Sequence, residues 1–175
     1  MSVGGKMSKT KRTKDMPKGH FRLAVSMGDS FYNTACVCEK DSPSEWLGNC
    51  LFPYVVNMSF ACEVYMKAIM IHFSKTNEFS TGHELQKLFA KLNHEAQKSV
   101  REWYEQEPRV YCEKLDSFLE EHNDIFMDFR YPFQDKDKDK DKEGLSVHVT
   151  GLGTFARSLN RYCHDLMGEV ENEQA

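Results

Sequence analysis

One stretch of the chain, from about Glu45 to Phe73, is apolar on nearly every side when its residues are placed on a helix. A helix that is hydrophobic all round is a buried one. The longest uninterrupted apolar run within it, residues 51–56, is far too short to span a bilayer. We therefore expect the central helix of a bundle, with either a kink or a fresh helix start at Pro53.

Other segments carry apolar residues at intervals of three and four, the spacing of an amphipathic helix. With only five prolines and ten glycines in 175 residues, little interrupts them. The sequence thus predicts an all-α fold, a helical bundle of five to six helices. Besides the central helix, the expected segments run from about His20 to Glu39, His83 to Leu92, Asn93 to Gln106, Arg109 to Met127 and Leu152 to Val170.

A different pattern occurs shortly before the last helix. Residues 129–133 and 145–149 alternate between apolar and polar side chains, which is typical of strands. Between them, residues 135–142 alternate strictly between Asp and Lys. We expect residues 135–143 to form a charged flexible loop, and the two flanks allow one short β-hairpin near residues 129–149.

Charge is distributed unevenly along the chain. The formal net charge is −4, yet residues 1–20 hold six Lys or Arg and one Asp. We expect residues 1–18 to be a disordered basic tail and residues 19–171 to fold as a single domain. Because the remainder is acidic, the composition argues against a broad phosphate-binding face, which requires clustered cations.

The six cysteines form no recognisable metal or redox motif. None belongs to a CxxC pair, and they lie in apolar, helix-like stretches. No Glu-x-x-His motif of the kind that holds metals in helical bundles occurs either. We therefore expect no metal and no cofactor. Because the sequence shows no signal-peptide pattern in front of the domain, we expect a reducing, cytoplasmic setting for these cysteines.

Gly151-Leu152-Gly153-Thr154-Phe155-Ala156 superficially matches a dinucleotide-binding fingerprint. That fingerprint requires a further strand with an acidic residue about twenty positions later, and the sequence ends first. We interpret the two glycines as relaxing the turn from the hairpin into the last helix.

Arg130 is the most conspicuous candidate for ligand binding. It lies among aromatic residues in segment 129–133, where Pro132 disfavours a helical conformation at Tyr131. A guanidinium is permanently charged, and its planar fork suits phosphate or carboxylate. Two interpretations stand. Either Arg130 and Tyr131 line a ligand pocket, or Arg130 is structural and bonds helix-end carbonyls or a carboxylate such as Glu63.

Three stretches occur in a characteristic order. Residues 57–68 place Glu63 and then Lys67 on one helix, residues 82–88 contain His-Glu-Leu with a further Leu three positions on, and Phe129-Arg130-Tyr131 ends a later helix. Together they resemble the HEPN superfamily, the helical domains of prokaryotic defence and toxin–antitoxin systems. The resemblance covers roughly residues 20–170.

This resemblance implies a bundle of four or more helices that dimerises. Catalytic members are metal-independent ribonucleases that use an Arg, a polar residue after it and a His four to six residues on. Arg130 matches that Arg, but Tyr131 follows it, and no His occurs in residues 134–137. Acid–base cleavage of RNA there lacks its proton-transfer group. We expect His83, just after Gly82, to cap a helix rather than to catalyse.

The expected function is therefore that of a HEPN-like domain that binds RNA, a nucleotide or a partner's acidic group without catalysis. We expect a cytoplasmic homodimer, a partner protein from a defence or toxin–antitoxin pair, and no membrane. One alternative is a metal-independent ribonuclease that uses Arg157 and His164, which share a helix face because seven residues span about two turns. The other is a dimerising protein-interaction module in which Arg130 is structural.

Overall fold

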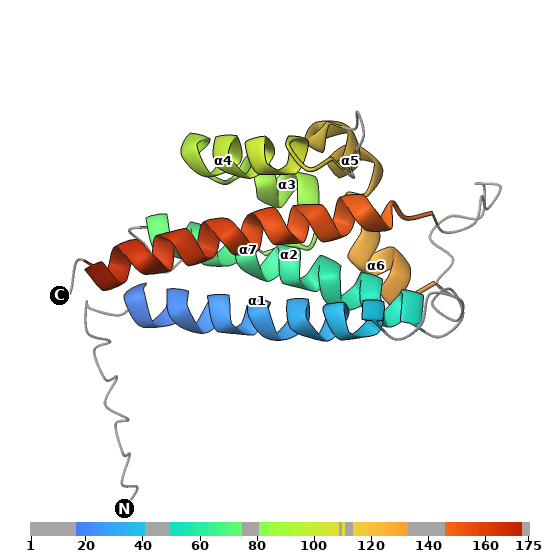
Figure 1. Ribbon diagram of the computed structural model, residues 1–175, viewed down its shortest axis with the longest axis horizontal. Coiled ribbons are helices and arrows are strands. Elements are labelled where there is room, and N and C mark those ends of the chain that lie inside the picture. Colours follow the sequence, from blue (N-terminus) through green and yellow to red (C-terminus); the bar gives the residue numbers. More distant parts are fainter. Residues whose placement is uncertain are drawn as a thin grey trace, which may run out of the picture.

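The computed structural model describes residues 17–40, 50–74, 81–108, 110, 114–132 and 146–172. Within these residues the chain forms seven helices and no strand, so the predicted all-α bundle is confirmed (Figure 1). The helices are α1 (Pro17–Lys40), α2 (Leu51–Phe73), α3 (Leu85–Ala90), α4 (His94–Glu105), α5 (Leu115–Glu121), α6 (Ile125–Arg130) and α7 (Val149–Asn172).

The three long helices α1, α2 and α7 lie side by side and contact one another (Figure 1). The short helices α3, α4 and α5 cover the side of α7 that faces away from α1, and α6 packs against α2. Helix α2 contacts α1, α3, α6 and α7, which makes it the central helix that the sequence predicts. The predicted basic tail lies outside the described residues, apart from Pro17 and Lys18 at the start of α1.

Helix α2 begins at Leu51, so Pro53 lies in its first turn. The missing N–H of proline breaks no intrahelical bond there, because the first N–H groups of a helix have no partner within it. Of the two outcomes expected at Pro53, the fresh start is the observed one. By length and composition alone, α2 could cross a membrane, but 67% of its most apolar window is buried inside the fold, as in a core helix.

The predicted continuous helix from Arg109 to Met127 is wrong, because the chain turns between α5 and α6. At this turn, His122 Nδ1 donates to the carbonyl of Phe118 (3.1 Å), and Nε2 accepts from the backbone N–H of His148 (2.9 Å). The next residue, Asn123, accepts from the N–H groups of Leu85 and Gln86 at the start of α3, each at 3.0 Å. The turn therefore bonds to the starts of two other helices. Because of this break, the described part of the chain contains one helix more than the predicted upper number.

The β-hairpin predicted near residues 129–149 is also wrong wherever the structure describes its flanks. Phe129 and Arg130 belong to α6, α7 begins at Val149, and residues 131–132 and 146–148 form no strand. Phe129 packs from α6 against Phe52, with ring centroids 5.5 Å apart, so its burial arises in a helix. The charged loop predicted at residues 135–143 lies outside the described residues.

Because α7 starts at Val149, Gly151 and Gly153 lie inside the helix rather than in a turn. A Cβ on Gly151 would lie 2.9 Å from the ring of Phe118, and one on Gly153 would lie 2.7 Å from the hydroxyl of Tyr54. The interpretation of these glycines as turn-relaxing residues is therefore corrected. They let the first turns of α7 approach α5 and α2 closely.

Candidate functional site

The candidate site surrounds the aromatic ring of Phe126, which is buried on α6. One turn further along the helix, the exposed Arg130 places its guanidinium 5.4 Å from the centroid of this ring. The same guanidinium lies 5.1 Å from the centroid of the Tyr131 ring. These distances are those of cation–π contacts, which hold the cation at the end of α6 while leaving it open to solvent.

A distant segment brings His83 to the same ring. The imidazole of His83 lies against Phe126, with ring centroids 5.4 Å apart. His83 follows Gly82, whose φ of +129° favours glycine, in the segment just before α3. The contact therefore joins two distant segments of the chain, and the spacing of apolar residues within either segment does not predict it.

Glu63 on α2 binds His83 and a second basic residue, Lys67. Its carboxylate is only 3% exposed, and Oε2 lies 2.7 Å from Nδ1 of His83 while Oε1 lies 2.6 Å from Nζ of Lys67. Burying a charge requires such partners, because desolvation otherwise makes it costly. With Nδ1 facing Glu63, the imidazole is held in one orientation. Its Nε2 forms no hydrogen bond with any described residue, and His83 is 48% exposed.

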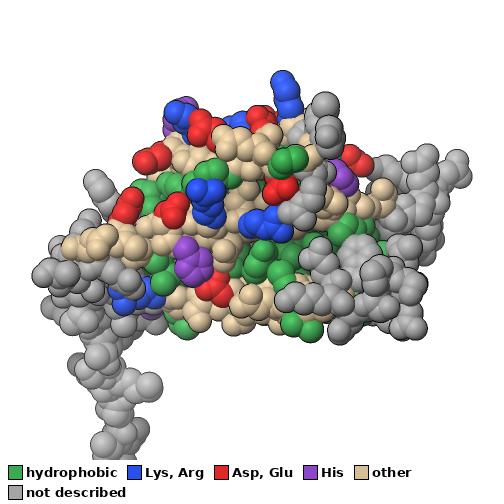
Figure 2. Space-filling model, viewed as in Figure 1, with side chains coloured by type: hydrophobic (Ala, Val, Ile, Leu, Met, Phe, Trp, Pro, Cys, Tyr) green, Lys and Arg blue, Asp and Glu red, His purple; other side chains and the backbone are tan. Residues whose placement is uncertain are grey.

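The arrangement favours an anionic ligand. Arg130 forms no ion pair with a described residue, so its guanidinium is not neutralised by a carboxylate within the described part of the chain. Lys67 and His83 share the single carboxylate of Glu63. Charged groups elsewhere are mixed: on the face seen in Figure 2, basic, acidic and histidine side chains are interspersed rather than gathered by sign.

Two expectations about these residues need correction. Glu63 is not the partner of Arg130, because Lys67, one turn along α2, and His83 occupy its two oxygens. His83 does not cap a helix, since α3 begins at Leu85 and its N-cap position is Glu84. The i,i+4 spacing of Glu63 and Lys67 is a local signal that pointed to their ion pair. No local signal pointed to the contact between His83 and Glu63, which are twenty residues apart.

Arg157 and His164, the alternative catalytic pair, contact different carboxylates. Arg157 Nη1 lies 3.3 Å from Oε2 of Glu107, and His164 Nε2 lies 3.1 Å from Oδ1 of Asp29. The rise of an α-helix separates the two positions by about 10 Å along α7. Within one copy of the chain, the structure does not bring them together at one point.

Asp29 belongs to a polar network that joins the three long helices. Its Oδ1 accepts hydrogen bonds from the hydroxyl of Tyr65 (2.7 Å) and from the side-chain amide of Asn160 (2.8 Å). The same amide lies 2.8 Å from the Tyr65 hydroxyl. His164 is at the exposed edge of this network, so its position has a structural explanation.

Comparison of the chain with protein-family models, with curated proteins and with solved structures found no match. Among the described residues, no group of three His, Cys, Asp or Glu side chains is placed to hold a metal ion. The function is therefore inferred from the site around Phe126.

Proposed function

We propose that this chain is a HEPN-like helical domain that binds single-stranded RNA at the site around Phe126. The observation that carries this proposal is the exposed guanidinium of Arg130 over Phe126, with the imidazole of His83 against the same ring. In this proposal Arg130 binds a phosphate, and Lys67 and His83 provide further donors. The dimerisation and the defence-system partner that the HEPN resemblance implies belong to the same proposal.

Several features favour RNA over an acidic protein segment. Proteins that bind single strands combine cations that contact phosphates with aromatic rings on which bases stack. Here Tyr131 lies directly beside the guanidinium of Arg130. A guanidinium binds phosphate and carboxylate alike through two parallel N–H bonds, so the aromatic ring beside it is what favours RNA. The small number of cations at the site implies modest affinity that falls as the salt concentration rises.

Replacing Arg130 by alanine is expected to weaken RNA binding by about tenfold, because one charge-assisted phosphate contact is lost. The slope of log affinity against log salt should become shallower by about one. Fluorescence anisotropy with a labelled single-stranded oligoribonucleotide measures both. Arg161→Ala is the matched control, since Arg161 is an exposed arginine 4.4 Å from the ring centroid of Trp103 on α4, away from this site. Equal affinities of the Arg130 variant and the wild type would contradict the proposal.

The same variant separates binding from a structural role. Arg130 is exposed, forms no ion pair with a described residue and contacts two rings, so Arg130→Ala should lower the free energy of unfolding by no more than about 1–2 kcal/mol. Urea unfolding measures this change. A loss of several kcal/mol would favour the interaction module in which Arg130 is structural.

RNA cleavage is a second candidate function, and the contact between Glu63 and His83 favours it. A carboxylate that orients an imidazole leaves the other ring nitrogen able to transfer a proton. The binding proposal expects RNA to stay intact when incubated with the protein in EDTA. Cleavage that His83→Ala abolishes would establish catalysis at this site. Cleavage that only His164→Ala abolishes would instead favour the pair Arg157 and His164.

A further inference from the structure

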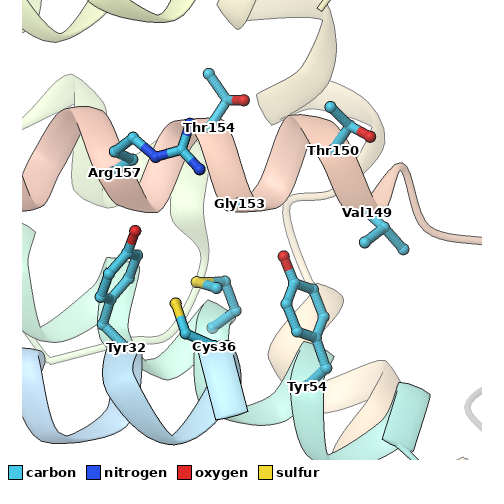
Figure 3. Close-up of a pocket in the computed structure, with 9 residues that line it drawn as sticks. Tyr32, Cys36, Tyr54, Val149, Thr150, Gly153, Thr154 and Arg157 are labelled. Atoms are coloured by element: carbon cyan, nitrogen blue, oxygen red, sulfur yellow. The ribbon is translucent and has the colours of Figure 1, made fainter. Parts of the chain in front are cut away.

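A cavity of about 80 Å³ lies where the N-terminal end of α7 meets α1 and α2. Figure 3 shows Tyr32 and Tyr54 extending from α1 and α2 with their hydroxyls toward α7, and the guanidinium of Arg157 lying along α7 above Tyr32. None of the lining residues belongs to the site around Phe126.

Gly153 keeps this cavity open. It has no side chain, and a Cβ at this position would lie 2.7 Å from the hydroxyl of Tyr54. The backbone of α7 is therefore exposed to the cavity between the two tyrosines. A volume of about 80 Å³ corresponds to about two or three water molecules. It accommodates a group the size of a phosphate, and it is too small for a nucleoside.

The chemistry of the lining suits an anion. Arg157, Tyr32 and Tyr54 provide a guanidinium and two hydroxyls, and no carboxylate lines the cavity among the described residues. Glu107 contacts the guanidinium at 3.3 Å from outside the lining and so helps to hold it in place. The guanidinium and the hydroxyls are hydrogen-bond donors that stabilise negative charge.

We propose that this cavity is a second site, which binds a small oxyanion of the phosphate class. Arg157 and the tyrosine hydroxyls donate hydrogen bonds to its oxygens, and the bare backbone at Gly153 gives the anion room. The anion is either free phosphate or the terminal phosphate of an RNA strand. This site does not depend on the function proposed for Arg130.

Titration of the full ¹⁵N-labelled chain with inorganic phosphate, against sodium chloride at equal ionic strength, tests the proposal by NMR. Saturable shifts are expected at the Gly153 and Thr150 amides and at Nε of Arg157. Arg157→Gln should weaken phosphate binding by about tenfold or more, since it removes the charge-assisted donor. Gly153→Ala should weaken binding, because the added methyl group takes up part of the cavity and its Cβ would lie 2.7 Å from the Tyr54 hydroxyl. Absent saturable shifts in the wild type, or unchanged affinity in Arg157→Gln, would overturn the proposal.

Further measurements test whether each variant is folded, separate this proposal from the RNA-binding proposal, and identify the source of the phosphate. Circular dichroism confirms that each variant is folded, and if Gly153→Ala is not, the result with Arg157→Gln decides. The phosphate-dependent shifts at the Gly153 amide and at Nε of Arg157 should be the same in Arg130→Ala as in the wild type, so failure of the RNA-binding proposal leaves this test intact. Competition by a 5′-phosphorylated oligoribonucleotide, but not by its 5′-hydroxyl form, would identify the RNA end as the ligand. No competition by either identifies free phosphate.

Discussion

Replacing Gly28 by alanine is expected to lower the free energy of unfolding by about 2 kcal/mol, although alanine is the better helix former. A Cβ at this position of α1 would lie 2.5 Å from Cε1 and 2.7 Å from Cδ1 of Tyr65. The Tyr65 side chain is fully buried, and its hydroxyl bonds to Asp29 and Asn160. The ring therefore cannot move aside without breaking that network, so overpacking exceeds the gain in helix propensity.

Gly168→Ala is the matched control, because Gly168 also lies within a helix and has nothing within 4 Å of the added Cβ. It should raise the free energy of unfolding by about 0.5–1 kcal/mol. Thermal unfolding compares the two variants, and 2 kcal/mol corresponds to a fall of about 4–8 °C for a domain of this size. If the melting temperatures of the two variants changed equally, Gly28 of α1 would not pack against the Tyr65 ring of α2 as the structure shows.

Alkaline pH is expected to destabilise the fold steeply. Burial raises the pKa of the Cys62 and Cys163 thiols far above their usual value, and the Asp29 carboxylate adds to the shift at Cys163. In the unfolded chain both thiols ionise near pH 9, whereas in the folded chain they stay protonated. The stability that depends on them is therefore fully present below about pH 9 and is lost as the pH rises above it.

Above about pH 9, where the thiols are ionised only in the unfolded chain, each thiol lowers the free energy of unfolding by about 1.4 kcal/mol per pH unit. The two thiols together lower it by about 3 kcal/mol per pH unit. Above about pH 10, Tyr65 adds to the loss, because burial and then its bond to Asp29 raise the pKa of its hydroxyl. Urea unfolding in reducing buffer at several pH values measures the slope. The double variant Cys62→Ala, Cys163→Ala should show a clearly shallower slope, whatever its effect on the free energy of unfolding at neutral pH. An unchanged slope would exclude these thiols as the cause.

The sequence predicted the helices whose signals are local. Helix α4 begins after Asn93, as expected, and Oδ1 of Asn93 accepts a hydrogen bond from the N–H of Ala96 at 2.8 Å. Helix α2 is recognisable because apolar residues surround it. The break between α5 and α6 was not predictable in the same way, because Asn123 there bonds to Gln86, 37 residues away. Periodicity within a window carries no information on such a contact.

The candidate site was predictable only in part. Arg130 stood out because aromatic residues surround it in segment 129–133. The structure places its guanidinium over one of those rings, Tyr131, and over Phe126, one turn back on α6. His83 was assigned to helix capping, because its contacts with Glu63 and Phe126 arise only when α2, α6 and the segment before α3 pack together. The pattern did show Glu63 and Lys67 one turn apart. It did not show that His83 would contact the second carboxylate oxygen of Glu63. Arg130 therefore appeared to be the ion-pair partner of Glu63.

The most direct test of a shared binding site at Phe126 is an NMR titration of the chain, with ¹⁵N-labelled histidine and arginine, by a single-stranded oligoribonucleotide. The signals of Nε2 of His83 and Nε of Arg130 should shift together with one affinity, because both groups contact the same aromatic ring. The signals of His164 and Arg161 should stay in place. Shifts at His164 and Arg161 with none at His83 and Arg130 would contradict an RNA site at Phe126.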